Sequence, residues 1–247
     1  MYANVRGHTI CVTAIQPDPV VVDLGANRSD FSTLMKTRFG GLYYLVEANP
    51  VLAGEIRQKG VFPVWQNAIA ARSGQVQFNI AQNNEGSSLL TLPGTSRWNA
   101  VLERTVTADA ITFVELMKQA GLTKIDLLKM DIEGAEIEVI HSIPRDVLRN
   151  IGQITVEFHS DPMFGFSLVR AVEGAIRYLQ KTGFAAMDFS EGTRRDVLFV
   201  NQHLHPLPFR ERFMWRLRTQ RPGWLAAMWL KFPGTWRAKL YKTIAKS

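Results

Sequence analysis

The sequence predicts an α/β protein built on a doubly wound, mostly parallel sheet with an antiparallel edge, followed by a C-terminal helical extension. Two observations lead to this prediction. From residue 20 to residue 201, short apolar or β-branched runs alternate with stretches of helical periodicity. Several of these runs end in Gly, Asn or acidic residues, as strands do where an open sheet binds a ligand. The alternation favours parallel strands with helices on both faces, which is a Rossmann-like architecture.

The expected elements follow one another in a regular order. Parallel strands are expected at residues 19–23, 42–46, 61–65, 124–132 and 153–159. Helices are expected at residues 31–39, 52–59, 135–141 and 166–181. An antiparallel pair is expected at residues 75–80 and 101–107, joined by a polar loop that we interpret as an insertion near the ligand-binding face, residues 82–98. A hairpin at the sheet edge is expected from residues 184–189 and 197–200.

Charge divides the chain into two parts. The first 201 residues carry 19 basic and 21 acidic side chains, whereas residues 202–247 carry ten basic and one acidic. We therefore expect a near-neutral domain at residues 1–205 and a basic, aromatic-rich extension at residues 206–247. The single cysteine, Cys11, excludes an intrachain disulfide framework and a cysteine-rich zinc site. No apolar leader and no run of about 20 apolar residues is visible, so a cytoplasmic protein is expected.

Candidate ligand-binding residues follow three successive strands. Asp23, Gly25 and Asn27 lie at the end of the first, where a glycine permits a tight turn. A dinucleotide pyrophosphate would need more glycines here, whereas S-adenosylmethionine carries positive charges that suit Asp23. Glu47 follows the second strand at the spacing of an acid that binds ribose hydroxyls. Asn67 follows the third strand, where a side chain would meet the adenine edge.

Each of these residues also has a plain structural explanation as a turn residue or a solvated strand end. Their coincidence at successive strand ends favours the cofactor site, because parallel strands bring their carboxyl ends to one edge of the sheet. The predicted cofactor-binding residues are Asp23, Gly25, Ala26, Asn27, Ser29, Phe31, Glu47, Ala48, Asn67, Ala68 and Asp131.

The densest signal is the segment Ile-Asp-Leu-Leu-Lys-Met-Asp-Ile-Glu-Gly-Ala-Glu at residues 125–136. Its acids can be explained by capping of the following helix or by its dipole. That explanation leaves Lys129, an ionisable group inside an apolar strand, which needs a carboxylate partner. The next strand ends in Glu157 and His159, which share a face and should approach the same pocket mouth. The predicted catalytic residues are Lys129, Asp131, Glu133, Glu157 and His159.

In these segments the chain resembles the FkbM-type methyltransferases. The matching segments lie in the family's order at residues 23–27, 30–32, 47–50, 67–68, 128–136 and 157–159. The block Lys-x-Asp-x-Glu-Gly-Ala-Glu is the most specific of them. Ser29 departs from the family, which usually has Gly there, and the departure costs little unless its φ is positive. The resemblance implies a class I methyltransferase fold, S-adenosylmethionine as methyl donor, and O-methylation, often of a sugar hydroxyl or a polyketide-like product.

Methyl transfer to a hydroxyl needs an in-line nucleophile and benefits from a base. Our hypothesis is that His159 or Asp131 takes the proton, with Glu133 and Glu157 orienting the site. The same groups offer a ligand set for a divalent metal. We favour a site without a metal, because Lys129 already neutralises part of the cluster. The favoured acceptor is a hydroxyl of a glycan, glycolipid or secondary metabolite.

The extension has the composition of a surface-binding segment. Residues 209–247 hold four of the six tryptophans, and their apolar residues fall at helical spacing among Lys and Arg. Such segments suit an anionic membrane, which would place the protein at the inner face of the membrane, but packing on the domain or on a second subunit explains them equally. In the first part, residues 209–221, Trp215 falls opposite Phe213 and Leu217, so the apolar face is poorly separated.

Two other functions stay open at this point. A nucleic-acid methyltransferase recruited by the extension is disfavoured, because the domain itself is not basic. A non-catalytic binding module that keeps the fold is hinted at by Ser29 alone. The sequence does not determine the acceptor, the position methylated or the oligomeric state.

Overall fold

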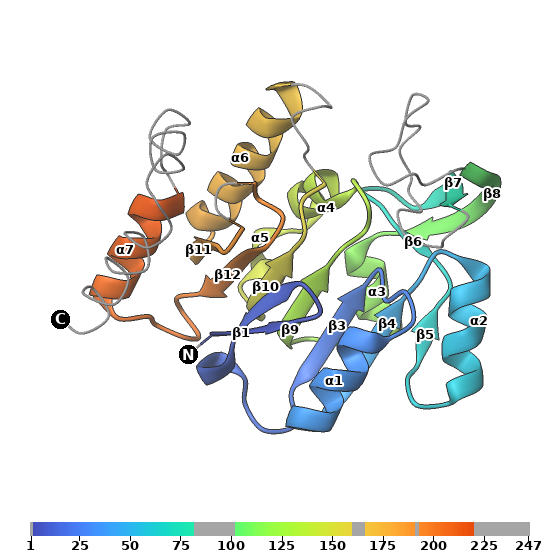
Figure 1. The fold of residues 1–247 in the computed structure, drawn as a ribbon, viewed down its shortest axis with the longest axis horizontal. Coiled ribbons are helices and arrows are strands. Elements are labelled where there is room, and N and C mark those ends of the chain that lie inside the picture. The colour runs from blue at the N-terminus through green and yellow to red at the C-terminus, as the bar shows by residue number, and fades with distance from the viewer. Residues whose placement is uncertain (1, 82–101, 160–165, 191–192, 220–247) are drawn as a thin grey trace, which may run out of the picture.

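The computed structural model describes residues 2–81, 102–159, 166–190 and 193–219. At its centre lies a seven-stranded sheet with the strand order β11-β12-β10-β9-β3-β4-β5 (Figure 1). Its strands are β3 (Val20–Leu24), β4 (Leu42–Val46), β5 (Val64–Trp65), β9 (Ile125–Met130), β10 (Ile151–Val156), β11 (Phe184–Asp188) and β12 (Val197–Asn201). Strands β10, β9, β3, β4 and β5 are parallel, and β12 runs antiparallel to both β10 and β11. The predicted parallel sheet with an antiparallel edge is confirmed.

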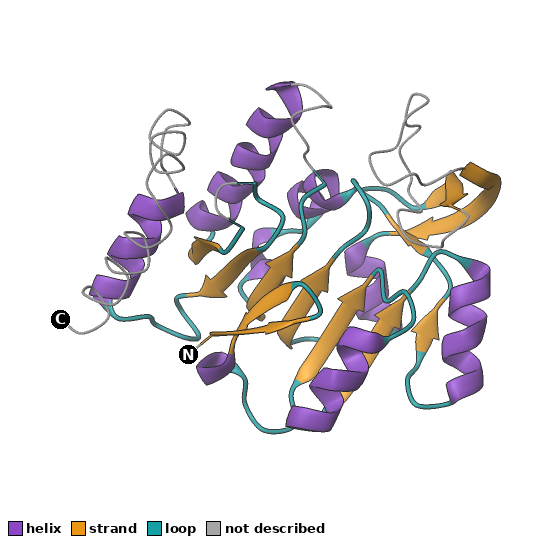
Figure 2. Ribbon diagram, in the orientation of Figure 1, coloured by secondary structure: helices purple, strands orange, loops and turns teal. Residues whose placement is uncertain are grey.

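Helices cover both faces of this sheet (Figure 2). The helices are α1 (Asp30–Phe39), α2 (Pro50–Lys59), α3 (Phe113–Gln119), α4 (Glu136–Ser142), α5 (Arg145–Leu148), α6 (Phe166–Lys181) and α7 (Phe209–Thr219), with a 3-10 turn η1 (Val12–Ala14). One core cluster holds buried residues of α3, α4, α5 and α6, and a second holds those of α1 and α2. The sheet is therefore doubly wound, and the carboxyl ends of its parallel strands stay free for a site.

A second, smaller sheet lies beyond β5. It has three strands in the order β6-β8-β7, namely β6 (Ala68–Ile69), β8 (Leu102–Ile111) and β7 (Gly74–Ala81). Strands β7 and β8 pair antiparallel, as the sequence predicts for this region. The polar loop expected between them falls outside the described residues.

An N-terminal hairpin was not predicted. Strands β1 (Tyr2–Val5) and β2 (His8–Cys11) pair antiparallel through a turn at Arg6 and Gly7, whose φ angles are 51° and 91°. The hairpin packs over β10 and β12 (Figure 1). The Gln153 side chain fixes it, because its Oε1 accepts from the Cys11 N–H at 2.9 Å and its Nε2 donates to the Cys11 carbonyl at 3.2 Å. Helix α3 was also not predicted.

The extension begins with α7, which lies against β11 at the sheet edge (Figure 1). The helices expected beyond Thr219 fall outside the described residues. Of the helices that are described, none has both the length and the apolar character needed to cross a bilayer.

Candidate active site

The loop after β3 passes close to the loop after β9. Gly25 has a φ of 76°, and its N–H donates to the Val46 carbonyl at 3.0 Å. A Cβ at this position would lie 1.8 Å from the backbone oxygen of Asp131. Any side chain would therefore push the two loops apart, so the position requires glycine for both its backbone angle and its contact.

Glu47 is the buried carboxylate at the end of β4. Its oxygens accept from the backbone N–H of Asn27 at 2.7 Å and from that of Asn49 at 2.8 Å. Burial raises the pKa of Glu47 to about 7, although these two hydrogen bonds and Lys129 act in the opposite direction. The carboxylate keeps acceptor capacity beyond these two bonds, because it offers about four lone-pair sites.

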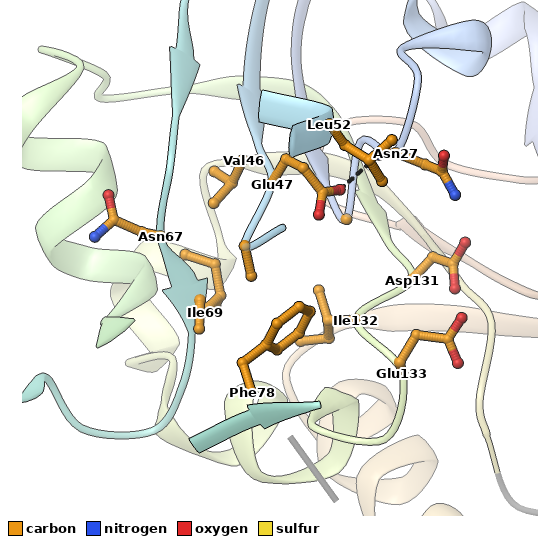
Figure 3. Close-up of a pocket in the computed structure, with 13 residues that line it drawn as sticks. Asn27, Val46, Glu47, Leu52, Asn67, Ile69, Phe78, Asp131, Ile132 and Glu133 are labelled. Carbon is orange, nitrogen blue, oxygen red and sulfur yellow. Dashed lines mark hydrogen bonds between the residues drawn. The ribbon is translucent and has the colours of Figure 1, made fainter. Parts of the chain in front are cut away.

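A pocket opens beside these groups (Figure 3). Asp131 and Glu133 lie on one side of it, Asn67 lies on the opposite side, and Phe78 and Ile132 lie between them. The predicted residues that line it are Gly25, Asn27, Glu47, Ala48, Asn67, Ala68, Asp131 and Glu133. Its apolar lining, which sequence reasoning did not name, comes from Val46, Leu52, Ile69, Phe78 and Ile132.

Four predicted cofactor residues do not line this pocket, namely Asp23, Ala26, Ser29 and Phe31. Asp23 is fully buried, and its Oδ2 accepts from the Ser32 hydroxyl at 2.7 Å. Its role in the structure is to hold the strand end and helix α1 together. Asn67 does line the pocket, but its amide nitrogen donates to the Asp109 carbonyl at 3.1 Å.

Lys129 connects the loop after β3 with the loop after β9. Its Nζ lies 3.2 Å from Asp23 Oδ1 and 3.5 Å from Asp131 Oδ2, and it donates to the Gly25 carbonyl at 2.6 Å. Burial acts to lower the pKa of Lys129, but Asp23 and Asp131 outweigh it and raise the pKa. The carboxylate partner that the sequence requires is present. Since Lys129 is itself buried and does not line the pocket, it acts by positioning the two loops.

Ser29 occupies a left-handed backbone conformation, with φ 66° and ψ 18°. It is fully buried, and its hydroxyl donates to the Arg28 carbonyl at 2.5 Å. The condition under which a serine would be costly here is therefore met, because a side chain in this conformation costs roughly 1 kcal/mol.

His159 gathers three carboxylates around one imidazole. Its Nε2 lies 3.1 Å from Glu133 Oε2 and 3.6 Å from Asp131 Oδ1, and its Nδ1 lies 2.9 Å from Glu136 Oε1. Burial acts to lower the pKa of His159, but Glu136, Glu133 and Asp131 outweigh it and raise the pKa to about 10. The imidazole is therefore protonated at neutral pH. The expected proximity of the ends of β9 and β10 is confirmed, because these strands are parallel neighbours.

Glu136 has a larger role than the helix-dipole complement considered from the sequence. It is buried, and its carboxylate accepts from the backbone N–H of Ile132 at 3.1 Å and of Gly134 at 3.0 Å. These bonds close the turn into α4, in which Glu133 has a φ of 53°. The turn directs Glu133 into the pocket while Glu136 holds His159 from the other side.

The pKa values of the other carboxylates near His159 differ from one another. Burial would raise the pKa of Asp131, but Lys129 and both neighbouring histidines hold it well below its usual range. Burial raises the pKa of Glu133 to about 7 and also raises the pKa of Glu157. At neutral pH Asp131 is therefore ionised, whereas Glu133 is poised between its two forms.

His8 is a site residue that sequence reasoning missed. It is buried on β2, and its Nε2 lies 3.5 Å from Asp131 Oδ2. Its ring stands edge-on to Phe31 with centroids 5.7 Å apart, and its Nδ1 has no hydrogen-bond partner among the described residues. Gly7 marks a turn in the sequence, but no signal there places His8 beside Asp131.

Two groups of side chains around Asp131 are close enough to hold a metal ion. They are His8 with Asp131 and Glu157, and Asp131 with Glu133 and His159. In both groups a cation is already present, because Lys129 contacts Asp131 and the His159 imidazolium faces the second group.

Comparison with known proteins identifies the family. The Methyltransferase FkbM domain matches residues 23–186, which is more than half of the chain. The chain belongs to the FkbM methyltransferase family. This FkbM protein is accordingly an S-adenosylmethionine-dependent methyltransferase, as the resemblance in its motifs implies.

Two curated proteins and one crystal structure are similar to this chain. It is 26% identical to the 2-O-methyltransferase NoeI of Sinorhizobium fredii over 82% of this chain and 88% of that protein. It is 29% identical to the AMB antimetabolite synthetase AmbE of Pseudomonas aeruginosa over 44% of this chain, which is 5% of that protein. The crystal structure of an FkbM methyltransferase from Methylobacillus flagellatus is 12% identical, with a TM-score of 0.45 over 74% of this chain and 43% of that one.

The pocket is lined by carboxylates and apolar side chains, which are the kinds of groups that would contact S-adenosylmethionine. Glu47 retains lone pairs for vicinal ribose hydroxyls, and the Asp131 and Glu133 carboxylates suit a ligand with positive charges. Phe78 and Ile132 offer an apolar surface for a flat base. Gly25 and Asn27 let the backbone approach the ligand from the strand end.

Proposed function

We propose that this FkbM protein methylates a hydroxyl group of a glycan, glycolipid or sugar-bearing metabolite. The observation that carries the proposal is that the Asp131–Glu133–His159 cluster opens onto the cofactor pocket itself, because Asp131 and Glu133 line it. When bound, S-adenosylmethionine supplies an electrophilic methyl group. A hydroxyl that attacks this methyl must lose its proton, and the cluster lies where that proton would be received.

Glu133 is the favoured proton acceptor within the cluster. A protonated His159 has no lone pair on Nε2, and a strongly ionised Asp131 is a weak base. Glu133 combines a pKa of about 7 with a place on the pocket wall, and a base is most effective when its pKa lies near the working pH. Asp131 and His159, which the sequence hypothesis put first, then orient the hydroxyl and stabilise the developing charge.

The choice of oxygen as the methyl acceptor is supported by the relative NoeI, which is named a 2-O-methyltransferase and is covered over 88% of its length. The retained acids and the organised cofactor loop favour catalysis over a binding module. None of the described residues that line the cofactor pocket is Lys or Arg, which disfavours a nucleic-acid acceptor.

The test is transfer of a labelled methyl group from S-adenosylmethionine to a panel of glycosides. We expect label in a glycoside that carries a free hydroxyl and none in the matched deoxy or pre-methylated glycoside. Mass spectrometry of the product locates the methyl group on oxygen or on nitrogen. Transfer to amino sugars alone, with the methyl on nitrogen, would refute the O-directed proposal while leaving the methyltransferase assignment intact.

A further inference from the structure

Helix α7 presents two apolar faces, which explains why its sequence looks poorly segregated. One face packs on the domain: the Trp215 ring lies 4.6 Å from that of Phe189, and the Tyr2 hydroxyl donates to Glu211. The other face carries Phe209 and Phe213, which are 73% and 52% exposed in the described part of the chain. The contacts of Trp215 and Glu211 attach α7 to the domain, while Phe209 and Phe213 stay exposed.

A groove of about 710 Å³ runs between this second face and the end of the sheet. It is bounded by the C-terminal end of α6, by β11 and by α7. Phe184, Phe209 and Phe213 form its apolar part, and the Phe209 and Phe213 rings stack with centroids 6.2 Å apart. Phe209 and Phe213 belong both to the lining of the groove and to the exposed face of α7.

The charged residues of the groove have one sign. Arg177, Lys181 and Arg212 line it and are exposed, and none of its described lining residues is Asp or Glu. None of these three cations makes an ion pair with another described residue. Exposed cations beside an exposed aromatic pair are complementary to a ligand that is both apolar and anionic.

We propose that this groove and the Phe209–Phe213 face of α7 dock the protein on an anionic lipid bilayer. Phe209 and Phe213 would enter the boundary between headgroups and acyl chains, while Arg177, Lys181 and Arg212 contact the headgroups. The proposal is independent of which hydroxyl is methylated.

The charges favour a bilayer over two other occupants of the groove, the C-terminal segment of this chain and a second copy of it. Residues 220–247 contain six Lys or Arg and no Asp or Glu, so the charge of this segment has the same sign as that of the groove and does not complement it. A second copy placed symmetrically on the same face would oppose the same three cations to one another. An anionic bilayer complements both the groove and the sequence that follows it.

The experiment is co-sedimentation of the full chain with vesicles of phosphatidylcholine alone and of phosphatidylcholine with phosphatidylglycerol. We expect binding to the anionic vesicles to be at least about tenfold stronger and to weaken with salt. The double variant Phe209→Ser/Phe213→Ser should lose about tenfold or more in affinity for anionic vesicles. The matched control is Leu34→Ser on α1, which removes a side chain that is 51% exposed and should leave binding unchanged.

A second pair of variants separates the charges from the rings. Lys181→Gln/Arg212→Gln should reduce the preference for anionic vesicles several-fold, whereas Lys118→Gln on α3 should not. Equal binding of wild type and Phe209→Ser/Phe213→Ser to anionic vesicles would overturn the proposal. So would equally weak binding of the wild type to both vesicle types, or a shift from dimer to monomer in the double variant. All variants should retain affinity for S-adenosylhomocysteine, which separates a failed docking surface from a failed methyltransferase site.

Discussion

The site has two halves, the donor half around the cofactor loops and the acceptor half around His159, and different interactions hold each in place. In the donor half, at the ends of β3 and β4, backbone N–H groups of Asn27 and Asn49 fix one carboxylate, Glu47. In the acceptor half, at the ends of β9 and β10, side-chain charges fix one another around His159 and Asp131. The position of Glu47 in the donor half is thus set by main-chain hydrogen bonds, whereas the acceptor half depends on a balance of charges. The donor half suits a cofactor that binds in the same way in every reaction cycle, and the acceptor half suits proton transfer.

Lys129 joins the halves, so its removal should have the largest effect. Two lysines on the same segment each lie 3.2 Å from an aspartate: the buried Lys129 from Asp23, and the exposed Lys124 from Asp126. We expect Lys129→Met to lower the free energy of unfolding by about 3–5 kcal/mol, because it leaves Asp23 buried without its cation. Lys124→Met should cost less than about 1 kcal/mol.

Urea denaturation of both variants measures the difference. Similar losses in the two variants would show that burial does not distinguish these ion pairs, and the description of Lys129 as the link between the halves would fail.

The next largest effect is expected in the acceptor half. Glu133→Gln should lower kcat by about 10²–10³-fold, because an amide cannot accept the hydroxyl proton, and should change affinity for S-adenosylhomocysteine little. Wild-type kcat should rise with pH through about 7 as Glu133 ionises, and the variant should lose this dependence. Glu138→Gln, at an exposed position on α4, is the control.

The pH profile also separates the two candidate bases. If His159 were the base, kcat would continue to rise toward pH 10, where its imidazolium loses its proton, and Glu133→Gln would keep that rise. A profile of this kind would identify His159 as the base, as the sequence hypothesis proposed.

These two regions also differ in how far the sequence predicts them. The donor half follows from strand order alone, because Gly25, Asn27 and Glu47 lie at strand ends that a parallel sheet must bring together. Lys129 was predictable as a buried cation in need of a carboxylate. His8 was not, because nothing in the sequence of the N-terminal hairpin specifies that it folds back over β10 and β12 to reach Asp131. The same holds for Phe78, which enters the pocket from the second sheet.

A smaller effect is expected from Glu47 in the donor half. Ribose hydroxyls donate to the ionised carboxylate, so the protonated form binds less well. Since the pKa of Glu47 in the free protein is raised to about 7, affinity is full above that pH and falls as pH decreases below it. We expect wild type to lose about tenfold in affinity for S-adenosylhomocysteine between pH 8 and pH 6 in titration calorimetry.

Glu47→Gln tests the cause of this dependence, because Gln resembles the protonated acid. It should bind about tenfold more weakly than wild type at pH 8 and lose most of the pH dependence. The half-exposed Glu55, on α2, supplies the control variant Glu55→Gln. A pH slope that survives in Glu47→Gln would assign it to another group, with Asp131 and Glu133 on the facing wall as the next to examine.

The smallest expected effect concerns Ser29 in the donor half. It is a fully buried residue other than glycine in a left-handed backbone conformation. Ser29→Gly relieves the left-handed conformation but loses the hydroxyl's bond to the Arg28 carbonyl, so we expect a gain in unfolding free energy below about 1 kcal/mol. Ser29→Ala keeps the strain and loses the bond, so it should be less stable than Ser29→Gly by about 1 kcal/mol. Chemical denaturation of the pair isolates the backbone term, because both variants lack the hydroxyl. If Ser29→Ala were the more stable of the two, the backbone at this position would not be left-handed in solution, and the donor loop would owe its shape to Gly25 and Lys129 alone.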